Sequence, residues 1–375
     1  MSDDLSEYLR AKEPGKAELA GLWRAAIGLQ KVDGLTPSAY LVETARRNIE
    51  GEITIAEAGK IIGEYYKSKA VRAEAAKTRT DEADIVSQRI TGILAEPTFS
   101  FSPASYVSIH RKLFAGVYKH AGKIRDYNIT KSEWVLKKDT VRYESADVIA
   151  ATLEYEFERE RRFNYKGLSP QETIAHFSRF IADVWQIHAF GEGNTRTTAI
   201  FAAKYLRTLG YTVENDIFAD NSFYFRNALV RANYTNVPKG IHPTLVYLER
   251  FFANLLLGEN NELKSRNLLV GLHEEPKSLA PLEREQAGEQ VREQVNMEVP
   301  KGVARLLKVL KGEMSVLDMM VALKLGGRRN FLEKYLTPSI ELGLVEMTQP
   351  NSPRSPTQKY RLTAKGKKLR QEVVK

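Results

Sequence analysis

Apolar side chains recur at helical spacing through the middle of the chain, most clearly between residues 169 and 188. One face of this segment carries Ile174, Phe177, Ile181, Val184 and Trp185. Just before them, Ser169 and Glu172 have the spacing of a capping box, and Pro170 occupies the first helical position. The pattern predicts a helix that ends at His188, with this histidine on the inward face.

A second helix is predicted directly downstream. Its apolar face is formed by Ile200, Phe201, Tyr205 and Leu206, and Gly210 closes the segment. The stretch HAFGEGNTRTT, residues 188–198, therefore joins two helices. The second helix directs its N-terminus towards whatever the loop holds.

The pattern divides the chain into four parts, residues 1–90, 91–265, 266–300 and 301–375. Residues 1–90 are predicted to be helical, with a turn at Asp33-Gly34, a helix cap within Thr36-Pro37-Ser38, a helix end at Gly51 and a helix start at Thr54. The segment 74–91 is charged and helix-like and leads into the next part. A mainly helical domain is expected over residues 91–265. A charged linker with two central prolines is expected over 266–300.

Residues 301–375 have the pattern of a winged helix. Two short helices, the second capped by Ser315, precede a third at GRRNFLEKYLTPSIELG; the strands LVEMT and KYRLTAKG follow. The expected fold class is thus mainly α, with a helical core and a small C-terminal domain.

The loop between the two central helices has the chemistry of a phosphate site. Backbone N–H groups of a glycine-bearing turn and of a helix start form a concave site for anions. His188 titrates near neutral pH when unperturbed and is suited to act as a general base. The simpler alternative is a helix–loop–helix with a core histidine. The adjacent acid, glycines, asparagine and arginine favour the phosphate site.

These residues resemble the signature of Fic-domain proteins, HxFx[D/E]GNGRxxR, which His188, Phe190, Glu192, Gly193, Asn194 and Arg196 match. The resemblance extends upstream through residues 106–129, YVSIHRKLFAGVYKHAGKIRDYNI, and downstream through 223–234, FYFRNALVRANY. It covers about the middle half of the chain. The resemblance implies transfer of a nucleotide, usually AMP from ATP, to a Ser, Thr or Tyr hydroxyl of a target protein.

The resemblance also assigns roles to individual residues. His188 would take the proton of the target hydroxyl, and Glu192 would hold Mg²⁺, which prefers carboxylate and phosphate oxygens. Arg196 would pair with a phosphate through its planar guanidinium. The expected nucleotide-binding set is Gly191, Gly193, Asn194, Thr195, Arg196, Thr197, Phe225 and Asn233.

A flap and two departures from the signature complete the comparison. The segment ITKSEWVLKKDTVRYES, residues 129–145, is extended-prone around a turn and resembles the family's β-hairpin flap, which aligns targets by strand addition. Thr195 replaces the second glycine of GNGR, and its hydroxyl is free to cap the helix or contact phosphate. Ala199 replaces the final arginine. Losing that charge-assisted bond costs about 1.5–3 kcal/mol, or ~10–100-fold in binding. Another donor nucleotide or weak activity therefore stays open.

The N-terminal part resembles the antitoxin-like helix that inhibits many Fic proteins through the motif [S/T]xxxE[G/N]. The best counterpart is LQKVDG, with Leu29 in the Ser/Thr place, Asp33 in the Glu place and Gly34 after it. The usual partner of the acid is the arginine replaced by Ala199, so inhibition is expected to be weak or rebuilt. A plain helix stop at Asp-Gly is an equally weighted alternative.

Composition and charge indicate where the protein is found in the cell and which part of the chain is basic. The chain has no cysteine, no apolar run of 18 residues and no apolar signal segment at its start, so we expect a cytoplasmic protein without disulfides or a membrane span. Residues 301–375 carry 16 Lys and Arg against 6 Asp and Glu, a net charge of +10 in a chain of +9. Arg328, Arg329 and Asn330 open the third helix, and Arg354 lies in the wing.

Such a basic helix-turn-helix is typical of DNA binding, although winged helices also dock proteins or form homodimers. Two hypotheses follow. The first is a Mg²⁺-dependent protein adenylyltransferase that uses ATP. The second is a DNA-binding regulator whose altered Fic core senses a nucleotide or acts as a scaffold.

Overall fold

The computed structural model describes residues 5–213, 215–272, 301–323, 325, 331–349 and 358–373. The chain divides into two compact units, Met1–Leu282 and Glu283–Lys375. Separate hydrophobic clusters lie within them: two in the first unit and one in the second. The described part of the chain is mainly helical, as the sequence predicts.

The N-terminal helices surround a small core that includes Trp23 and Leu41. They are α1 (Ser6–Ala11), α2 (Lys16–Gly28), the 3-10 helix η2 (Leu29–Asp33), α3 (Ala39–Ile49), α4 (Ile55–Tyr65), α5 (Lys69–Thr78) and α6 (Thr80–Ala95). Ser38 caps α3, and Thr54 forms a capping box with Glu57 at the start of α4. These caps confirm the two helix starts predicted here.

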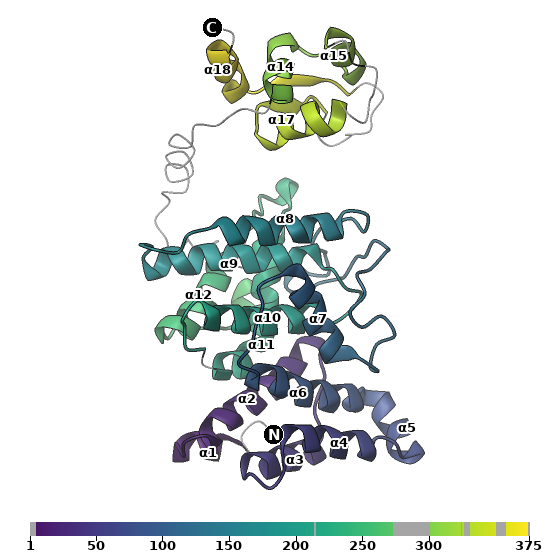
Figure 1. Ribbon diagram of the computed structural model, residues 1–375, viewed down its shortest axis with the longest axis vertical. Helices are drawn as coiled ribbons and strands as arrows, with labels where there is room; N and C mark the ends of the chain where they lie inside the picture. Colours follow the sequence, from purple (N-terminus) through teal and green to yellow (C-terminus); the bar gives the residue numbers. More distant parts are fainter. Residues whose placement is uncertain are drawn as a thin grey trace. The chain divides into compact units, whose positions relative to one another are not determined.

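The larger core is built mainly from helices later in the first unit, and α2, η2 and α6 also contribute residues to it (Figure 1). They are α7 (Pro103–Phe114), η3 (Trp134–Leu136), α8 (Ile149–Arg162), α9 (Pro170–Ile187), α10 (Asn194–Thr208), α11 (Asn215–Asn233), η4 (Val237–Lys239), α12 (Val246–Leu257) and η5 (Ser265–Leu268). Helix α9 begins with the predicted capping box and first-turn proline.

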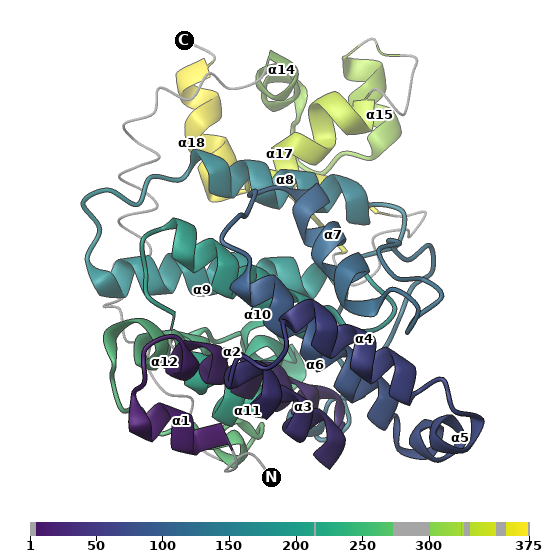
Figure 2. The same ribbon diagram turned by 60° about the horizontal axis from the view of Figure 1, so that its bottom comes forward.

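Helix α10 is the centre of this unit. Its residues from Asn194 to Leu206 are all buried, and it contacts α6, α7, α9 and η2 (Figures 1 and 2). A helix covered on every side is a rigid support for the loop at its N-terminus.

The N-terminal helices pack directly on this core. Gly28, at the end of α2, lies so close to α11 that an added Cβ would come within 2.2 Å of the Ala219 carbonyl oxygen. Helix α2 also contacts α6. Residues 1–90, predicted as a separate region, are therefore in one compact unit with the core, and η2 is carried to the start of α10.

The segment expected to be a β-hairpin flap does not form strands. Residues 131–145 fold back as a loop, in which the Glu133 N–H donates to the Asp139 carbonyl and η3 makes a single turn. Residues 129–145 contain no strand; η3 forms a turn there, with Val135 and Leu136 both buried.

The beginning of the predicted linker also differs. Leu268 and Val270 are buried in the larger core, and the Val270 N–H donates to the Val135 carbonyl. The core therefore extends beyond residue 265. The rest of the predicted linker, residues 273–300, lies outside the described residues.

The second unit contains helices followed by a two-stranded sheet. Its elements are α14 (Lys301–Val309), α15 (Val316–Ala322), a π-helical turn η6 (Leu332–Leu336), α17 (Thr337–Glu341), β1 (Val345–Met347), β2 (Tyr360–Leu362) and α18 (Ala364–Val373). The strands pair antiparallel, with Val345 opposite Leu362. Ser315 caps α15, as predicted. Helix α18 was not predicted, and Arg328, Arg329, Asn330 and Arg354 lie outside the described residues.

Among the described residues, no helix is both long enough and apolar enough to cross a membrane.

Candidate active site at the start of helix α10

His188 ends helix α9 in a left-handed conformation, with φ at +50°. This conformation is uncommon for a residue with a Cβ and is typical of helix ends and functional loops. Arg125 holds the turn: its Nε donates to the His188 carbonyl at 2.8 Å, and its Nη2 donates to the Ile187 carbonyl at 3.3 Å. The arginine thus satisfies the last carbonyls of α9 and fixes the direction of the histidine.

The imidazole of His188 is nearly enclosed. Only 4% of the residue is exposed, and its ring lies 4.1 Å from the ring of Tyr143, centroid to centroid. Its Nδ1 is buried and has no hydrogen-bond partner among the described residues. Burial lowers the pKa of His188 well below its usual 6.5, and the nearby charges of Lys131 and Arg226 lower it further. The imidazole is therefore neutral near pH 7, the state that a general base requires.

The loop after His188 is held by its own asparagine. The Phe190 N–H donates to Oδ1 of Asn194 at 3.0 Å, and Nδ2 of Asn194 donates to the Phe190 carbonyl at 2.7 Å. Gly193 then caps α10 with φ at +77°. The side chain of Asn194 is thus used to shape the loop, and the loop turns directly into the N-terminus of a helix, where unpaired N–H groups favour an anion.

His110, on α7, contacts the loop through a hydrogen bond and a ring stack. Its Nδ1 accepts the Gly122 N–H at 2.8 Å, so its Nε2 carries the proton and donates to the Glu192 carbonyl at 3.0 Å. Its ring stacks on Phe190 at 3.7 Å. Burial lowers the pKa of His110 to about 4, so this contact persists as a neutral hydrogen bond.

The two departures from the signature have clear surroundings. The Thr195 hydroxyl accepts a hydrogen bond from Nε1 of Trp185 at 3.0 Å, so it joins α10 to α9. The sequence left two roles open for this hydroxyl, capping the helix or contacting phosphate, and the bond to Trp185 is neither of them. Ala199 is buried within α10 and offers no charge.

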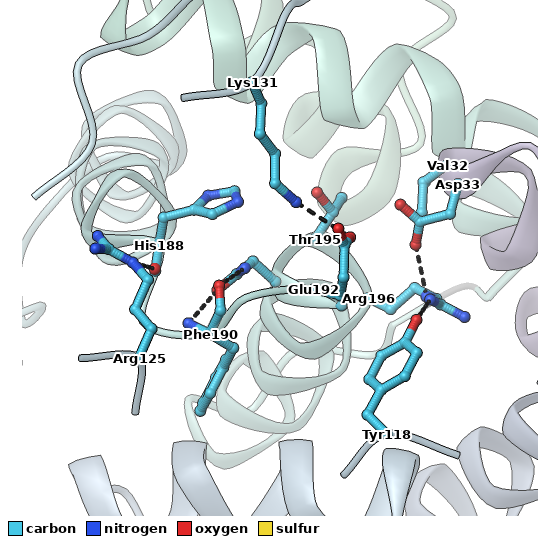
Figure 3. Close-up of polar contacts among 12 residues, drawn as sticks. Val32, Asp33, Tyr118, Arg125, Lys131, His188, Phe190, Glu192, Thr195 and Arg196 are labelled. Carbon is cyan, nitrogen blue, oxygen red and sulfur yellow. Dashed lines mark hydrogen bonds and ion pairs between the residues drawn. The ribbon is translucent and has the colours of Figure 1, made fainter. Parts of the chain in front are cut away.

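Glu192 projects from the loop into solvent. Its side chain is 52% exposed, and its Oε2 lies 3.1 Å from Nζ of Lys131 (Figure 3). No group of three or more acidic or histidine side chains is arranged to hold a metal within the described parts of the chain. A single accessible carboxylate nevertheless suits Mg²⁺, which usually takes one or two carboxylates and completes its shell with water and phosphate oxygens.

Arg196 is fully buried, and four side chains hold it; Figure 3 shows two of them, Asp33 and Tyr118. Its Nε lies 2.8 Å from Oδ2 of Asp33, and its other nitrogens donate to Gln30 at 2.9 Å, Glu82 at 2.8 Å and Tyr118 at 3.0 Å. Burial opposes the charge of the guanidinium, but Asp33, Tyr118 and Glu82 outweigh it and raise the pKa of Arg196.

The acid singled out in the N-terminal motif therefore does reach the loop, from η2. It pairs with Arg196, three residues before the position of the missing arginine. The guanidinium predicted to bind phosphate is occupied by protein groups in this structure.

The remaining predicted residues lie in several places. Phe225 is completely buried among Phe218, Phe251 and Phe252, so its ring faces the core and not a ligand. Asn233 donates to the Ala182 and Leu229 carbonyls at 3.0 Å and joins α11 to α9. The Thr197 hydroxyl donates to the Gly193 carbonyl within α10. At Gly191, a Cβ would meet the Tyr127 hydroxyl at 2.5 Å.

Two parts of the chain match known protein families. Residues 100–206 match the Fic/DOC family. Residues 301–363 match the family described as Filamentation induced by cAMP protein Fic-like, C-terminal domain. We refer to residues 100–206 as the Fic segment; it contains α7, α8, α9, all but the last two residues of α10, and the whole loop.

Two relatives carry related names. Protein adenylyltransferase VbhT of Bartonella schoenbuchensis is 30% identical over 108 residues, 29% of this chain and 21% of that protein. Probable protein adenylyltransferase y4lH of Sinorhizobium fredii is 28% identical over 131 residues, 34% of this chain and 64% of that protein. The matches thus span less than two thirds of the length of either relative.

A crystal structure of a Fic family protein from Desulfovibrio desulfuricans G20 aligns with a TM-score of 0.36 at 20% identity, over 90% of this chain and 97% of that one.

Several residues of the site were not found from the sequence. Inside the Fic segment they are His110, Tyr118, Arg125, Lys131 and Tyr143; outside it they are Gln30, Glu82 and Arg226. Only Arg125 had a signal, because it lies in the stretch AGKIR of the upstream resemblance, residues 106–129. The others are ordinary polar residues whose roles depend on which helices pack together.

Proposed function

We propose that this protein transfers AMP from ATP to a Ser, Thr or Tyr hydroxyl of a target protein, and to itself. The observation that carries the proposal is the position of His188. A neutral imidazole ends α9 at the loop that turns into the N-terminus of α10, within the Fic segment. The names of the two relatives support ATP as the donor.

The chemistry follows from this placement. The imidazole of His188 would accept the proton of the target hydroxyl as its oxygen attacks the α-phosphorus. A new oxygen–phosphorus bond forms, the bond from the α-phosphorus to the oxygen that bridges it to the β-phosphorus breaks, and pyrophosphate leaves. The backbone of the loop and the first N–H groups of α10 would hold the phosphates. Asn194 would act by keeping the loop in shape.

Glu192 is the residue that would hold Mg²⁺. When bound, the ion neutralises charge on the phosphate oxygens. Lys131, which contacts Glu192 in this structure, would move from the carboxylate to a phosphate as the ion enters. Both side chains are long and partly exposed, so this exchange needs no change in the fold.

We further propose that Asp33 restrains the reaction through Arg196. The guanidinium lies in a closed set of protein contacts and cannot pair with phosphate until Asp33 leaves. This arrangement replaces the acid–arginine pair that Ala199 makes impossible.

Incubation of the full chain with Mg²⁺ and labelled nucleotides tests the transfer. Label from α-labelled ATP, absent with γ-labelled ATP and lost in His188→Ala, is expected on this protein or on proteins of a lysate. His242→Ala, at an exposed histidine before α12, is the matched control and keeps the label. GTP, CTP and UTP in parallel identify the donor. Label that survives in His188→Ala would overturn the proposal.

The basic C-terminal unit supports a second candidate, a regulator that binds DNA through residues 301–375, whose net charge is +10. Fluorescence anisotropy with a DNA duplex tests it: binding is expected to weaken steeply as salt rises. No binding at low salt would leave protein docking as the role of this unit. In that case the apolar side chains Leu317 and Val321, exposed one turn apart on α15, are the expected contact.

A further inference from the structure

A cavity of about 310 Å³ lies where helices α6, α7 and α10 meet. Its walls come from the end of α6, the segment that joins α6 to α7, α7 itself and the later part of α10. Lys204, the residue that α10 contributes, lies about 15 Å along the helix from Asn194, at a rise of about 1.5 Å per residue. The cavity is therefore separate from the loop that contains His188. Pockets that bind small molecules have volumes of roughly 300–1,000 Å³, so this one suits a small ligand.

A buried ammonium group lines this cavity. Lys204 is only 4% exposed, and its Nζ donates to the Ile93 carbonyl at 3.1 Å and to the Glu96 carbonyl. A lysine is rarely buried without an acid beside it, yet within the described parts of the chain no carboxylate forms an ion pair with Lys204. An ammonium has three N–H donors, and the two carbonyls take only two of them. The third donor is available to a ligand.

The surroundings of Lys204 are short of negative charge. Burial lowers the pKa of Lys204 below its usual 10.5; the charge of Glu96 opposes this effect, and Arg207 and Lys112 add to it. The Glu96 carboxylate is engaged elsewhere, because it pairs with Nζ of Lys112 at 2.9 Å, and both side chains are about half exposed. An anion in the cavity would therefore stabilise a buried charge that no described side chain pairs.

Hydroxyl groups supply much of the remaining wall. Those of Thr98, Ser100 and Ser108 line the cavity, and none of the three makes a hydrogen bond to another described residue. The ring of Phe99 provides an apolar side. Among the described lining residues there is no arginine, the side chain whose planar fork matches a phosphate. One ammonium with several hydroxyls therefore suits a singly charged carboxylate better than a doubly charged phosphate.

We propose that this cavity binds a small organic acid, with the carboxylate on Nζ of Lys204 and the hydroxyl or carbonyl oxygens of the acid on the surrounding hydroxyl groups. The two backbone carbonyls that Lys204 contacts hold its ammonium in place for the ligand. The site is independent of the AMP transfer proposed above, because it shares no residue with the loop at the start of α10.

Ligand-observed NMR titration of the full chain tests the site. The probes are glycerate, lactate and pyruvate; glycerol has no charge, and glycerol 3-phosphate carries a phosphate in place of the carboxylate. At least one of the three acids is expected to bind, and more tightly than glycerol or glycerol 3-phosphate. Lys204→Met should weaken that acid ~10–100-fold, the range for a lost charge-assisted hydrogen bond.

Two further variants separate binding from folding. Lys204→Met also removes the contacts to the end of α6, so Ser108→Phe is the second variant: it fills the cavity, leaves Lys204 in place and should abolish binding of the acid. Lys60→Met, at an exposed lysine of α4, is the matched control and should bind as the parent does.

The outcomes decide between a ligand site and a lysine that only caps α6. No binding of any of the three acids by the parent would overturn the proposal. Equal binding by the parent and Ser108→Phe would also overturn it, because the acid would then lie elsewhere. Tighter binding of glycerol 3-phosphate than of every acid, lost in Ser108→Phe, would overturn the assignment to a carboxylate.

Discussion

Gly193 gives the sharpest test of how the loop is built, because both the backbone conformation and the packing oppose a side chain at this position. Its φ is +77°, in the left-handed region. A Cβ would also lie 2.4 Å from Cε2 of Phe114, a fully buried ring that stacks on Tyr118 and lies under the Arg196 guanidinium. Gly193→Ala therefore combines backbone strain with overpacking at the site itself.

The two terms have different sizes. A left-handed conformation costs a residue with a Cβ about 1–2 kcal/mol. Overpacking a tight core costs a further ~1–3 kcal/mol. Gly210, at the other end of α10, is the matched control: its φ is +91°, but a Cβ there meets nothing within 4 Å. Gly193→Ala should thus lower the free energy of unfolding by about 2–5 kcal/mol, and Gly210→Ala by only about 1–2 kcal/mol.

Urea unfolding followed by tryptophan fluorescence measures the difference. All three tryptophans, Trp23, Trp134 and Trp185, lie in the first unit, so the signal does not include the second. Equal destabilisation by the two substitutions would refute the assigned contact with Phe114. Loss of triphosphate binding in Gly193→Ala but not in Gly210→Ala would tie that contact to the phosphate loop.

Three further predictions follow from contacts around the loop. Thr195→Val should lower the stability of the first unit by about 1–3 kcal/mol in urea, because it leaves the buried Trp185 N–H without an acceptor, whereas Thr195→Ser should restore it. Because the pKa of His188 lies well below 6.5, the rate of AMP transfer should show no inflection near that pH, and a rate that halves there would contradict the neutral imidazole. His110 has a folded-state pKa of about 4, lower than when unfolded, so its contribution is present above about pH 6.5 and is lost as the pH falls through 4. That loss approaches ~3 kcal/mol, and the urea midpoint of His110→Gln should depend less on pH over this range than that of the parent.

The helix starts were predictable because their signals are local. Ser169 with Glu172, and Thr54 with Glu57, are three residues apart, and both capping boxes form as the spacing indicates. The signature around His188 is equally local. It located the loop and the two helices that it joins.

The contacts that set the state of the site were not predictable in this way. Asp33 and Arg196 are far apart in the sequence and meet only because η2 packs against α10. Glu82 belongs to a segment predicted only to be charged and helix-like, yet it is buried and pairs with both Arg196 and Arg79. Such pairs follow from helix packing, and one sequence contains no periodic signal for them. The predicted flap segment has a local signal, its extended-prone residues, yet it folds as a loop in which the adjacent Val135 and Leu136 are both buried.

The most direct test of the account is the initial rate of AMP incorporation from α-labelled ATP by four full-length proteins: the parent, Asp33→Asn, His188→Ala and the double variant. Asp33→Asn should label itself or a target faster than the parent, because Arg196 is released to bind phosphate, and both proteins with His188→Ala should remain unlabelled. Equal rates for the parent and Asp33→Asn would contradict the restraint by Asp33. Label on the double variant would contradict the role of His188.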